Sequence, residues 1–158
     1  MSSGITIKRG ASINLRGEAE KLITEAQTSK YSALKPDNFF NLVPRLLIKE
    51  GDSVAKGSPI FHAKHDPRIL FVSPISGVVK EIRRGAKRKI LEIVIENIKE
   101  SVIKHEVKPL AKMNRVSVIE TLLKSGAWPF IIQRPYGIIA EPDIKPKSIY
   151  VSTCSTAP

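Results

Sequence analysis

Two matched halves within residues 47–96 constrain the fold of this chain more than any other feature. Each half has an apolar segment, a short turn with a glycine, and a second apolar segment that runs back. Glycine suits the turns at Gly51 and Gly85 because such positions usually need a positive φ. Apolar residues alternate with charged ones along 79–82 and 91–96, which is typical of half-buried strands. The halves therefore predict two strand–turn–strand units joined by a hairpin.

The segments around these halves predict more β structure and one helix. Residues 39–49 are strand-like, and Pro44 makes this strand an edge or a bulge because proline has no N–H for the ladder. The polar residues 17–38 predict a variable connection, which follows two short strands within 5–15. Apolar residues recur at helical spacing over 116–126. The fold class predicted is mainly β, with α and β elements in separate stretches (α+β).

The predicted helix has signals at both ends. Asn114 or Ser117 is placed to cap its start, and Gly126 is placed to end it. Prolines punctuate the chain that follows, and 147–152 predict a buried strand that enters a new domain. The chain stops at Pro158, just after this strand, so we expect it to be part of a longer protein.

Charge and cysteine content limit the classes of function. The 158 residues carry a net charge of +11 and one cysteine. A single cysteine excludes an internal disulfide and an all-cysteine metal site built by this chain alone. No run of about 18 apolar residues occurs, and the N-terminus lacks the apolar segment of a secretory signal. We therefore expect a cytoplasmic protein without membrane spans.

The densest positive charge lies in the turn of the second half. Five of its seven residues are basic, namely Arg83, Arg84, Lys87, Arg88 and Lys89. Such a turn is either a solvated hairpin tip or a contact for an acidic protein face or an anionic lipid surface. We expect no nucleic-acid partner, because no aromatic side chains interleave with these cations to stack on bases.

The glycine turns carry a resemblance to a known domain. The stretch IKEGDSVAKGSPIF, followed by FVSPISGVVKEI, resembles the biotinyl/lipoyl-like barrel-sandwich hybrid. Carrier domains of that type present one lysine, usually beside methionine, at the hairpin between the halves. Here Lys64 has Ala63 and His65 as neighbours, and the hairpin is longer. Covalent attachment of lipoate or biotin is therefore not expected.

A longer resemblance covers nearly the whole chain. Three segments, ITIKRGASINL, SGAWPFIIQRPYGIIAEPD and SIYVSTCSTAP, join residues 47–96 in this match. Together they are similar to the N-terminal third of the A subunit of the bacterial Na⁺-translocating NADH:quinone oxidoreductase. The C subunit of the Rnf ferredoxin:NAD oxidoreductase shares the first-half turn and the Pro-x-x-Gly pattern. It remains an alternative, as does a carrier domain.

The resemblance implies a peripheral subunit on the cytoplasmic face of the bacterial inner membrane. The complex of that family oxidises NADH, reduces a quinone and moves Na⁺ outward. Its NADH, flavin and iron–sulfur sites lie in partner subunits, while the A subunit is associated with docking and with quinone. The resemblance thus implies no bound cofactor on this chain, quinone as a candidate ligand, and the other subunits of the complex as partners.

The residues themselves nominate no catalytic group and no metal site. No phosphate-binding glycine loop occurs, and no serine is paired with a base. His62, His65 and Asp66 are close in sequence, but the two histidines point to opposite faces of a strand. We therefore expect a surface hairpin at these residues rather than a metal centre.

One aromatic segment is a candidate binding site. Trp128, Phe130, Arg134 and Tyr136 combine apolar rings with a cation and a phenol. A quinone headgroup needs flat apolar walls and a hydrogen-bond donor for each carbonyl, and Arg134 or Tyr136 can supply one. The alternative is that the segment packs the helix against the next domain, with Trp128 as a core anchor. Both interpretations, a quinone-facing or subunit-facing role and plain packing, stay open.

These features divide the chain into four expected regions. Residues 1–38 hold the N-terminal strands and the variable connection, and 39–100 form the barrel-sandwich hybrid without an attachment lysine motif. Residues 101–146 comprise a linker, the helix and a proline-rich segment. Residues 147–158 begin a following α/β domain that is cut short.

Overall fold

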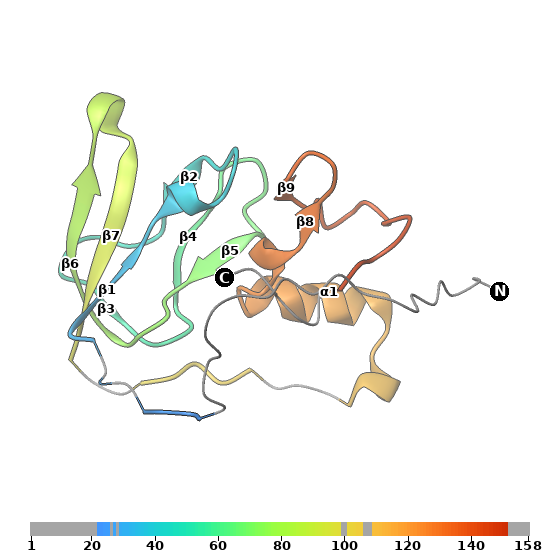
Figure 1. Cartoon of the computed structure of the whole chain (residues 1–158), viewed down its shortest axis with the longest axis horizontal. Coiled ribbons are helices and arrows are strands. Elements are labelled where there is room, and N and C mark those ends of the chain that lie inside the picture. Colours follow the sequence, from blue (N-terminus) through green and yellow to red (C-terminus); the bar gives the residue numbers. More distant parts are fainter. Residues whose placement is uncertain (1–21, 26, 28, 99–100, 106–108, 152–158) are drawn as a thin grey trace, which may run out of the picture.

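The computed structural model describes residues 22–25, 27, 29–98, 101–105 and 109–151. Their strands form two main sheets, beside one α-helix and a small C-terminal hairpin (Figure 1). The prediction of a mainly β fold with one α-helix is confirmed. The two short strands predicted within 5–15 lie outside the described residues.

The larger sheet has four antiparallel strands in the order β1-β7-β6-β3. They are β1 (Tyr31–Leu34), β3 (Ser53–Val54), β6 (Gly77–Arg84) and β7 (Ile90–Asn97). β6 and β7 form a long hairpin whose turn projects away from the other elements (Figure 1). β1 pairs with β7 inside the stretch where the sequence predicts only a connection. This strand was therefore not predicted.

The smaller sheet has three antiparallel strands in the order β2-β4-β5. They are β2 (Pro44–Leu46), β4 (Pro59–Ala63) and β5 (Leu70–Val72). β2 lies at the edge and begins at Pro44, where the missing N–H breaks no ladder bond. The edge position predicted from Pro44 is confirmed.

Side chains from both sheets fill one core. Ile60 and Phe61 of β4 and Ile93 and Ile95 of β7 are almost completely buried. Full burial of such a side chain contributes about 1.5–3 kcal/mol. Phe61 stacks on Phe71 of β5, with the ring centroids 4.5 Å apart. The alternation in the second half is thus confirmed, with its isoleucines turned inward.

The two turn glycines differ in conformation. Gly51 has a φ of 89°, as predicted. Gly85 is extended, with a φ of −100°, and Lys87 and Arg88 take the left-handed conformation in its place. The prediction is therefore wrong at Gly85, where glycine serves packing instead. A Cβ there would come within 3.2 Å of both methyl carbons of Leu91.

The α-helix among the described residues is α1 (Arg115–Lys124). The side chain of Asn114 accepts the Ser117 N–H at 2.8 Å, so Asn114 is the cap of the two that were predicted. Gly126 follows the helix end with a φ of 72°, in line with its predicted role. No helix in the described part of the chain is long and apolar enough to cross a membrane.

The C-terminal region packs on the same core as the sheets. Its short hairpin is formed by β8 (Ile132–Gln133) and β9 (Ile138–Ile139). Leu123, Trp128 and Ile139 belong to the core cluster of the sheets. The short 3₁₀ helices in the described ranges are Pro36–Asn38, Ala86–Arg88, Leu110–Lys112 and Trp128–Phe130.

The stretch after this hairpin differs from the expectation. Residues 147–151 form no strand, and Ile149, Tyr150 and Val151 expose most of their surface. The buried strand predicted over 147–152 is therefore wrong for these residues, because no described strand lies beside them to pair and cover them. The remaining residues, 152–158, lie outside the described part of the chain.

Candidate functional site

A groove opens where three segments of the chain meet. The loop before β2 contributes residues 40–43, the β4–β5 hairpin contributes Lys64 and His65, and the stretch from β9 onward contributes Ile138, Ile139 and Glu141. The volume of the groove is about 510 Å³. It therefore lies between the barrel sandwich and the C-terminal hairpin.

One wall of the groove is apolar and open to solvent. Phe40 and Val43 expose 70% and 55% of their surface. The neighbouring Phe39 turns inward instead, and its ring meets Phe71 edge-on at 4.7 Å between centroids. Asn41 takes a left-handed φ of 59°, which asparagine tolerates better than most residues. This wall offers an aromatic ring and an aliphatic side chain to a flat apolar ligand.

Polar groups lie at the same groove. Lys64 and Asn41 carry hydrogen-bond donors, the imidazole of His65 donates or accepts, and Glu141 accepts. The backbone N–H of Lys64 donates to the carbonyl of Val43 at 2.9 Å, which ties the β4–β5 hairpin to the apolar wall. The groove thus combines an apolar wall with a few polar groups, as ligand sites commonly do.

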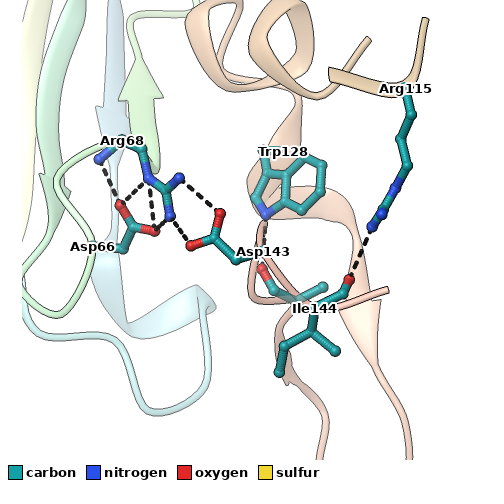
Figure 2. Close-up of polar contacts among 7 residues, drawn as sticks. Asp66, Arg68, Arg115, Trp128, Asp143 and Ile144 are labelled. Atoms are coloured by element: carbon teal, nitrogen blue, oxygen red, sulfur yellow. Dashed lines mark hydrogen bonds and ion pairs between the residues drawn. The ribbon is translucent and has the colours of Figure 1, made fainter. Parts of the chain in front are cut away.

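An ion cluster, here called the clasp, joins the β4–β5 hairpin to the segment after β9. Arg68 donates to Asp66 from the same hairpin at 2.7 Å and to Asp143 at 2.6 Å (Figure 2). A further bond from Arg68 to Asp143 is 3.0 Å long, so the guanidinium holds this carboxylate with two nitrogens. The clasp connects two of the segments that also line the groove.

The clasp shifts the pKa values of its members. Hydrogen bonds from Arg68 hold the pKa of Asp66 and of Asp143 below the usual range of aspartate. The bonds to Asp143 and then to Asp66 raise the pKa of Arg68. All three groups therefore stay charged at neutral pH, and the clasp stays closed there.

Trp128 gives the C-terminal segment a second attachment. Its indole Nε1–H donates to the carbonyl of Ala140 at 2.7 Å (Figure 2). Ala140 lies between Ile139 and Glu141, which both line the groove. Trp128 itself is 7% exposed and belongs to the core cluster. Trp128 therefore holds the segment that contributes Ile139 and Glu141 to the groove, but does not line the groove itself.

The four residues predicted to face quinone or another subunit differ in exposure. Trp128 is buried, whereas Phe130 exposes 75% and Tyr136 67% of their surface. Arg134 is exposed and precedes a cis proline in the β8–β9 turn. None of the four lines the groove. The position of Trp128 fits the core-anchor alternative, and the roles of the other three stay predictions.

Sequence reasoning missed the groove residues themselves. Phe40, Lys64 and His65 come from segments interpreted as a strand and as a surface hairpin. One signal was present, because Asn41 directly follows two phenylalanines. An asparagine there favours a turn in which one ring is inside and the next is outside.

The basic residues of the second turn fall into two groups. Arg83 donates to Glu81 at 2.9 Å and also bonds Glu92. Lys89 pairs with Asp37 at 2.8 Å. In the described part of the chain, no ion pair involves the other three cations, Arg84, Lys87 and Arg88. We call residues 84–88 the basic tip.

The histidines of the β4–β5 hairpin serve different purposes. His62 is half-buried, and its Nδ1 lies 2.9 Å from the carbonyl of Ala63. His65 is exposed at the groove. No group of three His, Cys, Asp or Glu side chains that could hold a metal ion occurs among the described residues.

The fold and the site define a barrel-sandwich hybrid that packs on a helical C-terminal region and carries an open groove. The model of the NqrA N-terminal barrel-sandwich hybrid domain matches residues 5–98, and that of the NqrA second alpha/beta domain matches 113–158. The chain therefore belongs to the NqrA family. The second match starts inside the region predicted as 101–146, and the expected division into four regions stays a prediction.

Relatives with curated names agree with this membership. The A subunit of the Na(+)-translocating NADH-quinone reductase of Tolumonas auensis is 37% identical over 158 residues. The proteins of the same name from Mannheimia succiniciproducens and Vibrio atlanticus are 34% and 32% identical over 157 residues. Each match covers 98% of this chain and 35% of the relative, so the chain spans about a third of their length.

Proposed function

We propose that this chain is the N-terminal part of the A subunit of a Na⁺-translocating NADH:quinone reductase. The observation that carries the proposal is the match of two NqrA domain models in order along the chain. Relatives with that subunit name, similar over 98% of the chain, support it. The family match favours this assignment over the carrier-domain and Rnf alternatives.

In this proposal the chain is a peripheral subunit on the cytoplasmic face of the bacterial inner membrane. The other subunits are its partners and carry the NADH, flavin and iron–sulfur sites. This chain contributes docking surface and no catalytic residue. The electron transfer and the sodium transport named for the relatives are then activities of the whole complex.

We place the quinone-binding role of the chain in the groove, where the lining residues support it. A quinone headgroup is a flat ring with two carbonyl acceptors. Phe40 and Val43 supply an apolar surface for the ring, while Lys64 and Asn41 supply donors for the carbonyls. The volume of about 510 Å³ is in the range of small-molecule sites.

Phe130, Arg134 and Tyr136 keep a role in this proposal as a subunit-facing surface. They belong to the C-terminal region and do not line the groove. The ring of exposed Phe130 meets that of Phe39 edge-on, at 6.0 Å between centroids. Exposed aromatic side chains are enriched where protein surfaces dock.

Capture of the complex tests the docking part of the proposal. The chain is tagged and used as bait on detergent-solubilised membranes that contain the reductase. Flavin and iron–sulfur absorbance in the eluate are then measured. We expect both signals with the wild-type chain.

A variant that combines Phe130→Ser with Tyr136→Ser tests where the docking surface lies. Both side chains are exposed in the structure. This variant should fold normally and recover less flavin and cluster than the wild type. A colourless eluate from the wild-type chain contradicts docking by this part of the subunit. Equal recovery by both proteins contradicts the placement of the docking surface at Phe130 and Tyr136.

A further inference from the structure

The basic tip has a surplus of positive charge that the chain itself does not neutralise. Its flanking cations, Arg83 and Lys89, bind carboxylates of the same domain. Arg84, Lys87 and Arg88 are exposed and make no ion pair with any described residue. Three cations within five residues and without carboxylates repel each other, and an anionic partner would remove that cost.

The tip is a compact turn that projects from the domain. Gly85 N–H donates to the carbonyl of Lys89 at 2.8 Å, and Lys89 N–H donates to Ala86 at 3.2 Å. Lys87 and Arg88 take left-handed φ values of 54° and 60° at its end. The hairpin carries this turn beyond the other elements, so a flat surface can meet it without a clash (Figure 1).

A partly exposed apolar side chain lies next to the turn. Leu91 exposes 43% of its surface although it belongs to β7. Its methyl carbons lie against Gly85, where any Cβ would displace them. A partly exposed aliphatic side chain therefore lies beside the turn that carries these cations.

We propose that the basic tip contacts the surface of an anionic phospholipid membrane. Basic side chains near such a surface are attracted to its negative potential, and an apolar side chain among them reaches the boundary between headgroups and acyl chains. The exposed Leu91 favours lipid over an acidic protein face, because charge pairing with carboxylates gives no use for an aliphatic side chain there. The tip thus orients the domain on the membrane.

Vesicle flotation tests this inference on the 158-residue chain alone. The probes are vesicles of phosphatidylcholine with phosphatidylglycerol as the minor anionic lipid, and vesicles of phosphatidylcholine only. We expect flotation with the anionic vesicles and none with the neutral ones. The triple variant Arg84→Gln, Lys87→Gln, Arg88→Gln should lose binding on the order of 100-fold, since each basic residue near the surface contributes roughly a five-fold factor.

Two further variants make the outcome decisive. The triple Lys104→Gln, Lys112→Gln, Lys145→Gln removes the same net charge outside the tip, and it should bind much more strongly than the tip triple. The double Arg84→Lys, Arg88→Lys keeps the charge and should bind like the wild type. Equal losses in the two triples would mean that net charge alone acts, and would overturn the proposal.

Failure of the wild-type chain to float would also overturn the inference and would leave an acidic partner subunit as the better candidate for the tip. The assay contains no quinone and no other subunit. Its failure therefore leaves the proposed place of the chain in the reductase untouched.

Discussion

The β4–β5 hairpin and the β6–β7 hairpin both end in turns that contain arginine, but they use the charge differently. In the first, Arg68 is held by Asp66 and Asp143 and joins the hairpin to the segment after β9. In the second, Arg84 and Arg88 make no ion pair among the described residues, and the turn projects into solvent. Arg68 thus links two segments of the chain, whereas Arg84 and Arg88 can pair with the acidic groups of a partner.

This difference shows that positive charge in a turn does not by itself indicate an interaction surface. The presence of an acidic side chain within reach decides the outcome. Asp143 is far from Arg68 in sequence, yet it comes next to that hairpin because β9 packs on the core. The predictions below alter the two hairpins and their supports, in order of decreasing effect on stability.

Gly77→Ala should break the base of the β6–β7 hairpin. A Cβ at this position would lie 1.8 Å from the carbonyl oxygen of Glu96, so the strands would have to separate. We expect a loss of about 3 kcal/mol or more in the free energy of unfolding. Urea unfolding followed by far-UV circular dichroism measures it.

Gly137→Ala is the matched control in the β8–β9 turn. Gly137 also has a positive φ, of 70°, but no atom lies within 4 Å of its Cβ position. The expected cost is only that of the left-handed conformation, about 1 kcal/mol. A similar cost at both glycines would contradict the close approach of β6 to β7.

Trp128→Phe should loosen the attachment of the C-terminal segment. The change removes the hydrogen bond to the Ala140 carbonyl and leaves a gap beside the core. We expect a loss of about 2 kcal/mol in the free energy of unfolding. Thermal unfolding measures it, and an unchanged Tm would mean that the clasp alone holds this segment.

Asp143→Asn should weaken the clasp in a pH-dependent way. Because Arg68 lowers the pKa of Asp143 in the folded protein, this carboxylate adds stability above its unfolded pKa of about 3.9. That contribution is lost as the pH falls through the folded pKa. The Tm difference between wild type and variant should therefore be constant near neutral pH and shrink below about pH 4.

Asp37→Asn is the control for the other hairpin, since it removes only the exposed pair with Lys89. It should change the Tm less than Asp143→Asn does. If Asp143→Asn had no effect at any pH, the clasp would contribute nothing to the link between the β4–β5 hairpin and the C-terminal segment.

The triple exchange of Arg84, Lys87 and Arg88 to glutamine should have the smallest effect on folding. These side chains are exposed and pair with no described carboxylate, so the free energy of unfolding should stay within about 0.5 kcal/mol of the wild type. Chemical unfolding measures it. A clear loss of stability would show that the tip has an internal structural role.

The local patterns of the sequence predicted much of the fold. The alternation over 91–96 placed Ile93 and Ile95 in the core, and Asn114 and Gly126 marked the helix ends. Each of these signals depends on neighbours within a few residues. β1 was missed because its pairing with β7 decides its structure, and its own sequence alternates little.

The site was less predictable because distant segments build it. Residues 40–43, Lys64 and Ile138 meet only after the C-terminal hairpin packs on the core. The pairing of Lys89 with Asp37 joins residues 52 positions apart, so the sequence did not separate the paired cations from those of the basic tip. Trp128 was predicted as a candidate core anchor, and its burial is consistent with that interpretation.

Binding of a quinone in the groove is the most specific role proposed for this chain, and Trp128 reports on it directly. It is the only tryptophan of the chain, and its indole bonds the residue between two groove residues. Fluorescence is titrated with a short-chain quinone for the wild type, for Val43→Arg in the groove, and for Val116→Arg on the exposed face of α1. We predict saturable quenching for the wild type and Val116→Arg, with much weaker quenching for Val43→Arg. Equal, non-saturating quenching of all three proteins would contradict binding in the groove.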